Sequence, residues 1–452
     1  MAEPALESHT DTHLEALTDA LQSGTLKQAR AVVSALHPAE IAHLLESLPP
    51  SQRRIVWEMV DRDDHGEVLL HVGDEVRAGL IEAMDYEALL SATEGLDVDD
   101  LADLLQDLPD VVTRQALAGM DQQYRQRLEA VLSYGEDTAG GLMNTDTVTV
   151  RANVTLDVVL RYLRMKNDIP DLIDSLIVVN RYDRYLGILP LSVVVTRDPE
   201  LTVAEVMDYS VEGIPAQTPA AQVAKIFEDR DLVSAPVVDE HGKLLGRITI
   251  DDVVDVIREQ AEHSVLSSVG LTEEEDIFAP VLPAARRRAI WLGTNLVTAF
   301  LAAAVVGQFQ KTLEQVVALA VLMPIVASMG GIAGSQTLTL VIRALALGQI
   351  GKRNARLLMG KELAVGVFNG IAWSLVVAAV AVAWFQNLRI GGVIAAAIVI
   401  NLLCAALAGV GIPLLMRRFG IDPALAGPVV LTTVTDIVGF LAFLGLATLV
   451  LL

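Results

Sequence analysis

Five long uncharged runs end the chain, and they constrain its fold more than any other feature. They are Ala289 to Phe309, Val316 to Ile342, Leu363 to Leu388, Ile390 to Met416, and Pro423 to Leu452, the last interrupted only by Asp436. Each run reaches the roughly 20 residues that a helix needs to cross the hydrocarbon core of a membrane. The sequence therefore predicts five transmembrane helices.

Charge is segregated along the chain. Residues 285–452 hold 12 Lys or Arg and 4 Asp or Glu, net +8, which leaves 21 bases and 53 acids, net −32, for residues 1–284. An acidic surface repels phosphate, so nucleic acid is excluded as a partner and divalent cations are favoured. The single cysteine, Cys404, lies in an apolar run, which excludes disulfide frameworks and cysteine zinc sites.

The basic residues of the apolar part predict its orientation. They cluster before the first helix, between helices two and three, and between helices four and five, whereas the opposite loops carry only Lys311 and Arg389. By the positive-inside bias the acidic half is cytoplasmic and the C-terminus lies outside. The N-terminus has neither a basic region nor an apolar region of a signal peptide, which agrees with this orientation.

The acidic half divides into two kinds of repeat. In residues 1–135, the segment Leu36 to Pro49 recurs as Leu96 to Pro109, which predicts a domain of short helices stacked in a superhelical layer. From residue 136 the pattern becomes α/β, with modules at 136–205 and 206–262. Val178 and Leu186 are spaced like Val237 and Leu245, and such tandem modules resemble a pair of CBS (cystathionine β-synthase type) ligand sensors. We expect a connecting helix at 263–285 and the membrane domain at 286–452.

Asp436 is the strongest candidate for a functional residue. A carboxylate inside an apolar 30-residue run costs about 2.5–3.5 kcal/mol on insertion scales, so it needs a polar partner, water or a cation. At helical spacing, Thr432 and Thr433 lie one turn before it and Gly439 nearly one turn after it. This face predicts a hydrated path, and the alternative is a protonated acid that only packs helices.

The second predicted membrane helix carries a second candidate site, from Pro324 to Gln336. Its proline removes one backbone donor, and its glycines permit close approach or a local break, which a bilayer tolerates only against protein or water. Free carbonyls near Gly331, together with the oxygens of Ser335 and Gln336, suit a hard cation. The alternative is that the glycines form a close helix contact, and both can hold together.

Three sets of residues in the acidic half are candidate ligand sites. Thr249 and Asp252 form a Thr-x-x-Asp pattern for a nucleotide ribose, with ATP as the ligand, or a plain structural turn. Acids at helical spacing, Asp99 with Asp103 and Asp252 with Asp255 and Glu259, repel one another. Bound divalent ions would relieve that repulsion, and the alternative is a solvated charged face.

The sequence lacks the residue patterns that several classes of enzyme require. The membrane part has no histidine and no paired aspartates, and the chain contains no H-E-x-x-H, G-x-S-x-G or P-loop pattern. We therefore expect that the protein is not an enzyme.

Taken in order, these segments resemble the MgtE family of magnesium channels over nearly the whole chain. The resemblance is most specific in Pro324 to Gln336, Lys361 to Gly370 and Ile421 to Gly439. It implies a homodimer in the bacterial inner membrane, in contact with lipid, with hydrated Mg2+ between two copies of Asp436 and with Gly331 and Ser335 nearby. It also implies closure when cytoplasmic Mg2+ bridges the N domain, the CBS modules and the connecting helix.

Two other functions stay open at this point. A cation antiporter would share the membrane helices, and a membrane-anchored sensor of Mg2+ or nucleotide would share the soluble half without conducting. The chain also departs from the family pattern, at Ile332 and Pro428 in the membrane part and at Pro219, Ala221, His263 and Ser264 in the soluble part. The Thr-rich face of Asp436 favours a channel, because a mere anchor does not need it.

Overall fold

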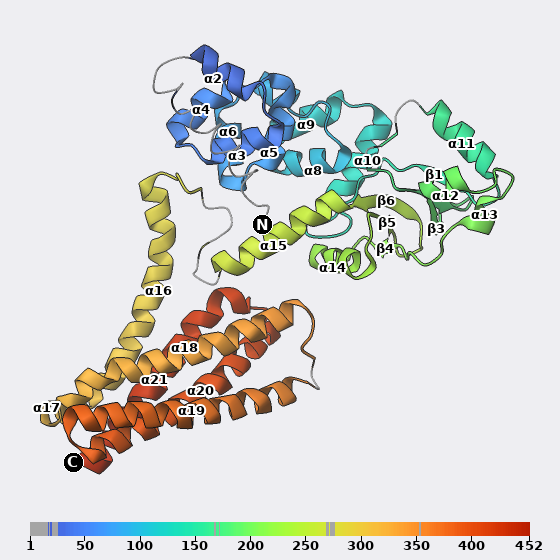
Figure 1. The fold of residues 1–452 in the computed structure, drawn as a ribbon. Helices are drawn as coiled ribbons and strands as arrows, with labels where there is room; N and C mark the ends of the chain where they lie inside the picture. The colour runs from blue at the N-terminus through green and yellow to red at the C-terminus, as the bar shows by residue number, and fades with distance from the viewer. Residues whose placement is uncertain are drawn as a thin grey trace. The chain divides into compact units, whose positions relative to one another are not determined.

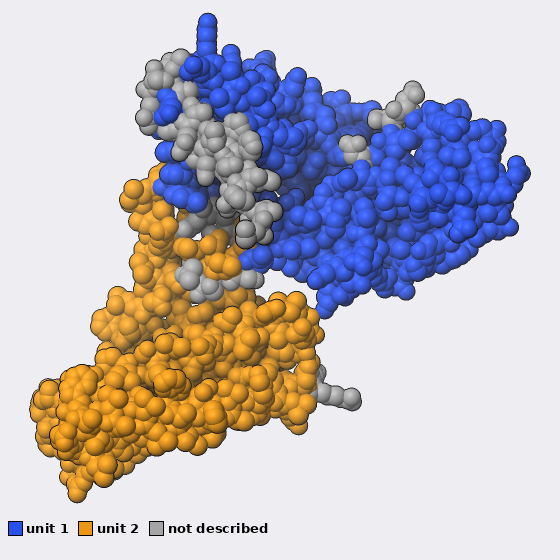
Figure 2. Space-filling model, in the orientation of Figure 1, with its two compact units in different colours: residues 1–261, 274–279 blue, residues 262–273, 280–452 orange. Residues whose placement is uncertain are grey.

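The computed structural model describes residues 17, 19, 26–166, 169–170, 172–267, 271, 276–351 and 354–452, with only the backbone for Asp110, Gln123 and Ser264. It forms two compact units, shown in Figure 2. The first consists of residues 1–261 and 274–279, and the second of residues 262–273 and 280–452. The acidic residues are concentrated in the first unit, and the five apolar runs lie in the second.

The first unit begins with short helices, as the sequence predicts (Figure 1). The two copies of the sequence repeat form α3 and α8, and each copy ends in a proline, Pro49 or Pro109, directly before the next helix. Proline restrains the residue before it from helical geometry, so each repeat stops at the same place. The helices are α2 (Leu26–Val33), α3 (Pro38–Glu46), α4 (Pro50–Trp57), η1 (Arg62–Asp64), α5 (His65–His71), α6 (Asp74–Ala83), α7 (Tyr86–Ser91), α8 (Val98–Asp107), α9 (Asp110–Gly119) and α10 (Gln122–Leu132).

Two three-stranded sheets of identical topology follow, β1-β2-β3 and β4-β5-β6. In each sheet the first strand runs parallel to the second, and the second runs antiparallel to the third. Val178 lies opposite Gly187 and Val237 opposite Gly246, so the repeated residue pairs occupy the same register. The elements are β1 (Thr149–Arg151), α11 (Leu156–Met165), β2 (Ser175–Val179), β3 (Tyr185–Pro190), α12 (Leu191–Thr196), α13 (Val203–Val206), β4 (Ile214–Pro215), α14 (Ala220–Arg230), β5 (Ser234–Val238) and β6 (Leu244–Thr249).

The opening segment of each module pairs with the last strand of the other. Asn144 forms a bridge to β6, and Asp208 forms a bridge to β3. A Cβ atom at Gly187 would lie 2.5 Å from the Asp208 carbonyl oxygen, and one at Gly246 would lie 2.6 Å from that of Asn144. Both glycines are therefore required by close approach of backbone, and the two modules interlock.

A long helix, α15 (Ile250–Ser267), continues from β6 and confirms the helical periodicity expected there. The next helix, α16, begins at Val281 after Pro280. The expected connecting helix at 263–285 thus covers the end of one helix and the start of another, and residues 268–270 and 272–275 lie outside the described chain. The predicted domain boundaries stay a prediction.

The second unit contains the five predicted apolar helices, each long enough to cross a membrane (Figure 1). Helix α20 packs against α18, α19 and α21, while α16 packs mainly against α21. In its most apolar stretch 56% of the residues of α20 are buried, against 6% in α16, so α20 is the centre of the bundle. The helices are α16 (Val281–Gln308), α17 (Gln310–Gln315), α18 (Ala318–Ala346), α19 (Ala355–Phe385), α20 (Leu388–Arg418) and α21 (Pro423–Leu451).

Candidate cation sites

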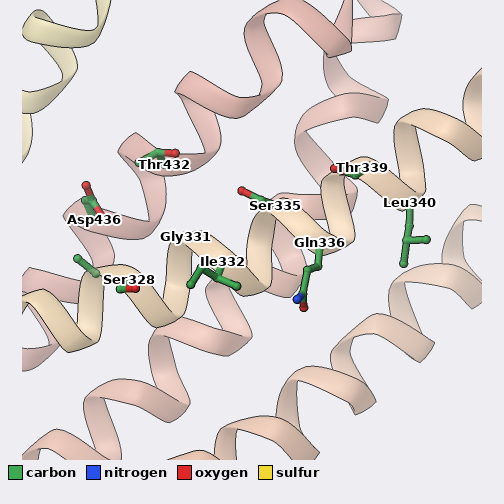
Figure 3. Close-up of a pocket in the computed structure, with 10 residues that line it drawn as sticks. Ser328, Gly331, Ile332, Ser335, Gln336, Thr339, Leu340, Thr432 and Asp436 are labelled. Carbon is green, nitrogen blue, oxygen red and sulfur yellow. The ribbon is translucent and has the colours of Figure 1, made fainter. Parts of the chain in front are cut away.

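A cavity of about 940 Å³ lies along α18 and α21 in the second unit (Figure 3). All four residues predicted to line a pore, Asp436, Thr432, Gly331 and Ser335, lie on it. The other lining residues are Ala327, Ser328, Ile332, Gln336, Thr339 and Leu340. The polar groups are a carboxylate, hydroxyls and an amide, which are oxygen donors of the kind that Mg2+ and Ca2+ prefer.

The Asp436 carboxylate is half-buried in this cavity. Within the described chain no side chain donates a hydrogen bond to it and no base pairs with it. Thr432, one turn before it, also lines the cavity, and its hydroxyl donates to the carbonyl oxygen of Pro428 at 2.9 Å. The Asp436 carboxylate has no protein partner among the described residues, and the Thr432 hydroxyl oxygen lies on the same cavity. Together they are suited to hold a cation.

Thr433, which shares the Thr-rich pattern, does not line the cavity. Its hydroxyl donates to the carbonyl oxygen of Val429 at 2.7 Å within the same helix. The sequence grouped both threonines with Asp436, but residues three and four positions before a given residue point in directions about 100° apart on a helix. Only Thr432 faces the cavity.

The glycines of α18 divide between the two roles proposed for them. A Cβ atom at Gly330 would lie 2.2 Å from Asn401 Nδ2, and one at Gly334 would lie 3.0 Å from Leu431, so both glycines sit at helix contacts. A Cβ at Gly331 would meet no atom of the described chain within 4 Å, and this residue faces the cavity. The packing interpretation therefore applies to two glycines and the pore interpretation to the third.

Of the two alternatives for these glycines, close approach or a local break, the structure shows close approach. Helix α18 is continuous from Ala318 to Ala346, through both Pro324 and the glycines. Its backbone near Gly331 is therefore helical. The oxygen donors of α18 at the cavity are consequently the side chains of Ser328, Ser335, Gln336 and Thr339.

In the first unit, the two predicted acidic groups lie beside each other. Burial, reinforced by the charge of Asp100, raises the pKa of Asp99 on α8 to about 7. Burial, reinforced by the charge of Asp99, raises the pKa of Asp252 on α15 to about 8. Asp99 and Asp252 are 153 positions apart in the sequence, but their carboxylates lie close enough to repel each other. The charge of one therefore disfavours ionisation of the other.

Further acids of α8 extend this cluster. Burial raises the pKa of Asp103 to about 7, with Glu136 as the next cause, and raises that of Asp100 to about 6, with Asp97 next. The remaining predicted ligands, Asp255 and Glu259, are exposed on α15, and Arg258 Nη2 lies 3.5 Å from Asp255 Oδ1. No three acids, histidines or cysteines of the described residues are grouped closely enough to hold a metal ion.

Sequence reasoning missed Asn144 as a neighbour of these acids. Its Nδ2 donates to Asp99 Oδ1 at 3.1 Å, and the residue is buried. The only signal was a polar residue directly after the Met143 segment that opens the first α/β module, and no spacing links it to α8.

Thr249 and Asp252 satisfy each other at the start of α15. The Thr249 amide and hydroxyl donate to Asp252 Oδ2 at 3.2 and 3.1 Å, and the same hydroxyl also donates to Asp251. Thr249 is buried. In this conformation the pair serves the turn into the helix, and its assignment to a nucleotide stays a prediction.

Models of protein families match most of the chain. The MgtE model, described as a divalent cation transporter, matches residues 323–446, and that of the MgtE intracellular N domain matches 36–137. The CBS domain matches twice, at 139–197 and 203–259. The chain belongs to the MgtE family.

Relatives in the MgtE family span nearly the same length. The Magnesium transporter MgtE of Thermus thermophilus is 33% identical over 440 residues, which cover 96% of this chain and 98% of that protein. The Magnesium transporter MgtE of Bacillus subtilis is 27% identical, covering 95% of each chain. A crystal structure of the cytosolic domain of the Mg2+ channel MgtE in complex with ATP is 34% identical and covers 54% of this chain and 99% of that one, with a TM-score of 0.48.

Proposed function

We propose that this protein carries Mg2+ through a bacterial inner membrane, down the electrochemical gradient. The observation that carries the proposal is the unpartnered carboxylate of Asp436 in a cavity lined by Thr432, Gly331 and Ser335. Magnesium transport in the relatives from Thermus thermophilus and Bacillus subtilis supports it. The soluble half is cytoplasmic and the C-terminus lies outside, because the basic loops are on the side of the soluble half.

The size and chemistry of the cavity support a hydrated ion. Mg2+ gives up its water reluctantly and usually keeps several water ligands. A cavity of about 940 Å³ has room for an ion with its waters. The Asp436 carboxylate attracts the ion, and the hydroxyl oxygens accept hydrogen bonds from its waters. Ion passage needs no bond to be made or broken, so the protein is not an enzyme on this proposal.

The functional form is a homodimer, with one pathway between two copies of the membrane unit. Gly331 faces space that its own chain leaves open, and α16 exposes large apolar side chains such as Ile290, Leu292 and Phe300. A second copy facing the cavity would place a second Asp436 opposite the first, and lipid would cover the remaining apolar surface. Two carboxylates bind a divalent ion more strongly than one.

Regulation belongs to the acids of α8 and α15. Asp99 is buried and Asp103 and Asp252 are partly buried beside like charges, and Asp255 and Glu259 extend the acidic surface of α15. Cytoplasmic Mg2+ that binds these carboxylates removes their repulsion and favours the compact arrangement of the soluble half. High cytoplasmic Mg2+ would in this way close the pathway.

Flux into liposomes tests the transport proposal. Purified protein is reconstituted, and entry of Mg2+ under an inward gradient is compared for the native chain and Asp436→Asn. We expect the variant to lose flux by about 100-fold, because the charge that attracts the ion is gone. Thr433→Val is the matched control on the same helix, since Thr433 does not line the cavity.

The same assay separates the alternatives. Equal flux in the native chain and Asp436→Asn would refute the pore assignment. Flux that requires a gradient of protons or Na+ would support an antiporter, and no native flux under a large gradient would support a sensor that does not conduct.

Binding of ATP at Thr249 and Asp252 is a subsidiary proposal. It requires the hydrogen bonds between these two residues to open, because both groups now satisfy each other. Calorimetric titration of the full-length protein with ATP, compared between the native chain and Thr249→Ala, tests it. Equal heats in the two proteins would exclude this site.

A further inference from the structure

Helix α18 carries buried polar contacts on the face opposite the cavity. Its buried residues include Val326, Gly330 and Thr337, which share one side at helical spacing. The cavity residues Gly331 and Ser335 lie on the other side. The position of the cavity wall therefore depends on what holds α18 from behind.

The first contact comes from Asn401 of α20. This side chain is 1% exposed, and its Nδ2 donates to the carbonyl oxygen of Val326 at 2.8 Å. Cβ atoms at Gly330 and Gly439 would lie 2.2 and 2.7 Å from the same nitrogen, so both glycines leave room for the amide. Asn401 thus touches α18 one residue before Gly331 and touches α21 three residues after Asp436.

The second contact comes from Glu362 of α19. Lys361 Nζ lies 2.8 Å from Glu362 Oε1. The carboxylate is nevertheless buried, with 5% of the residue exposed, and its Oε2 accepts a hydrogen bond from Thr337 Oγ1 at 3.0 Å. Glu362 therefore joins α19 to the back of α18.

Buried polar groups are unusual within membrane helices. An apolar side chain would fill either place without the cost of removing a polar group from water. Both groups instead bond to α18, at points eleven residues apart on the same face. Two fixed points on one helix set both its distance from its neighbours and its rotation.

We propose that Asn401 and Glu362 are positioning residues for the cation pathway: they hold α18 at Val326 and Thr337 and so fix Gly331 and Ser335 relative to Asp436. The inference rests on the proposed transport function. A displaced wall changes the fit to a hydrated ion, so selectivity between Mg2+ and the larger, more easily dehydrated Ca2+ depends on these contacts.

The test for Glu362 uses its partner, Thr337. Thr337→Val keeps the shape and removes the hydroxyl, whereas Thr337→Ser keeps the hydroxyl. We expect the Mg2+ to Ca2+ flux ratio in liposomes to fall about fivefold or more in Thr337→Val and to stay near native in Thr337→Ser. A purely space-filling role predicts the opposite order, because valine preserves the volume and serine does not.

The test for Asn401 uses the glycine that accommodates it. Gly330→Ala alone should lower the Mg2+ to Ca2+ ratio, because its Cβ collides with the amide. Adding Asn401→Ala removes the collision, so the double variant should transport more Mg2+ than Gly330→Ala while its selectivity stays low. Gly411→Ala in α20 is the control, since a Cβ there meets no described atom within 4 Å.

A second measurement does not depend on transport. In a Cys404→Ala background, Ser335→Cys on the cavity wall is modified by a membrane-impermeant thiol reagent. Its rate should change about threefold or more when Thr337→Val or Gly330→Ala is added, and not with Thr337→Ser or Gly411→Ala. Unchanged rates in all four would overturn the positioning role. Absence of Mg2+ flux in the native protein would instead refute the proposed transport function. The thiol-modification rates would still test whether Asn401 and Glu362 hold α18 in place.

Discussion

Buried carboxylates in the two units differ in what surrounds them. In the second unit, called the membrane unit below, Glu362 pairs with Lys361 and accepts a hydrogen bond from Thr337. The first unit is called the soluble unit. In the soluble unit, Asp99 and Asp252 lie among other acids, and their pKa values are raised to about 7 and about 8. The first arrangement is satisfied and structural. The second holds repulsion that protons or cations relieve, which is what a sensor of divalent ions requires.

The first unit also contains an acid that is buried and paired with a base, Asp276. It lies just before α16 and is joined to Arg53 of α4 by two bonds, at 2.8 and 3.0 Å. Arg53 also donates to the carbonyl oxygens of Leu45 and Leu48, and the two side chains are 8% and 5% exposed. Pairing with a base, rather than burial, therefore distinguishes Asp276 from Asp99 and Asp252.

The largest expected effect follows from breaking this pair. Arg53→Met leaves Asp276 buried without its base, which costs about 3–5 kcal/mol of stability in the soluble unit. Hydrogen exchange of α4 in the full-length protein measures the loss. Arg161→Met is the control, because the Arg161 to Asp157 pair is exposed and contributes less than about 1 kcal/mol. Similar losses in both variants would show that the buried pair is not special.

The unpaired acids predict a dependence on pH. Asp99, Asp100, Asp103 and Asp252 have raised pKa values, so the folded soluble unit binds more protons than the unfolded chain between about pH 4 and pH 8. Its stability in the absence of Mg2+ therefore falls as pH rises through this window. Protease protection at about pH 5.5 and pH 8, with and without Mg2+, checks this. Greater protection at the higher pH without Mg2+ would contradict it.

Removing one of the charges should strengthen the unit. Asp252→Asn can still accept the hydrogen bonds from Thr249, but it no longer repels Asp99, so we expect a gain of about 2 kcal/mol near pH 7.5 without Mg2+. The further protection by Mg2+ should shrink. Asp157→Asn, on the exposed face of α11, is the matched control. A loss of stability in Asp252→Asn would mean that its charge is compensated in the native protein.

The smallest expected effect concerns an exposed pair in the membrane unit. His263 Nε2 lies 3.1 Å from Asp422 Oδ2, and Asp422 Oδ1 caps α21 by accepting from Ala424 N at 2.9 Å. Both side chains are partly exposed, so His263→Ala should cost about 0.5 kcal/mol in thermal unfolding, less at high salt. Asp422→Ala also removes the cap and should cost about 1 kcal/mol more. Equal effects would show that the cap contributes nothing.

The sequence predicted features that depend on pattern. Five apolar runs predicted five helices because each is long enough by itself, and the spacing of Val178 and Leu186 predicted the α/β repeat because strand register follows from period two. Asp436 stood out because no other acid interrupts a predicted membrane helix. Of its three predicted companions at the cavity, Thr432 lies on the same helix, and Gly331 and Ser335 lie one turn apart on α18.

The features that the sequence did not predict are contacts between neighbouring helices. Helix α18 is continuous through Pro324 and its glycines, and local pattern had left a break open. Thr433 faces away from the cavity because adjacent residues of a helix point about 100° apart. Glu362 is buried, and Thr337, 25 residues earlier in the chain, donates a hydrogen bond to it. No local pattern carries that information.

By itself, the sequence determined the five apolar helices, the charge division and the residue types available to bind a cation, because length, hydropathy and periodicity are local properties. Only the tertiary structure decided which acids are paired and which repel. Burial and the distance between charges are set by helices far apart in the chain, such as α8 with α15 and α18 with α19. The same carboxylate is structural or responsive according to the neighbour that the fold brings to it.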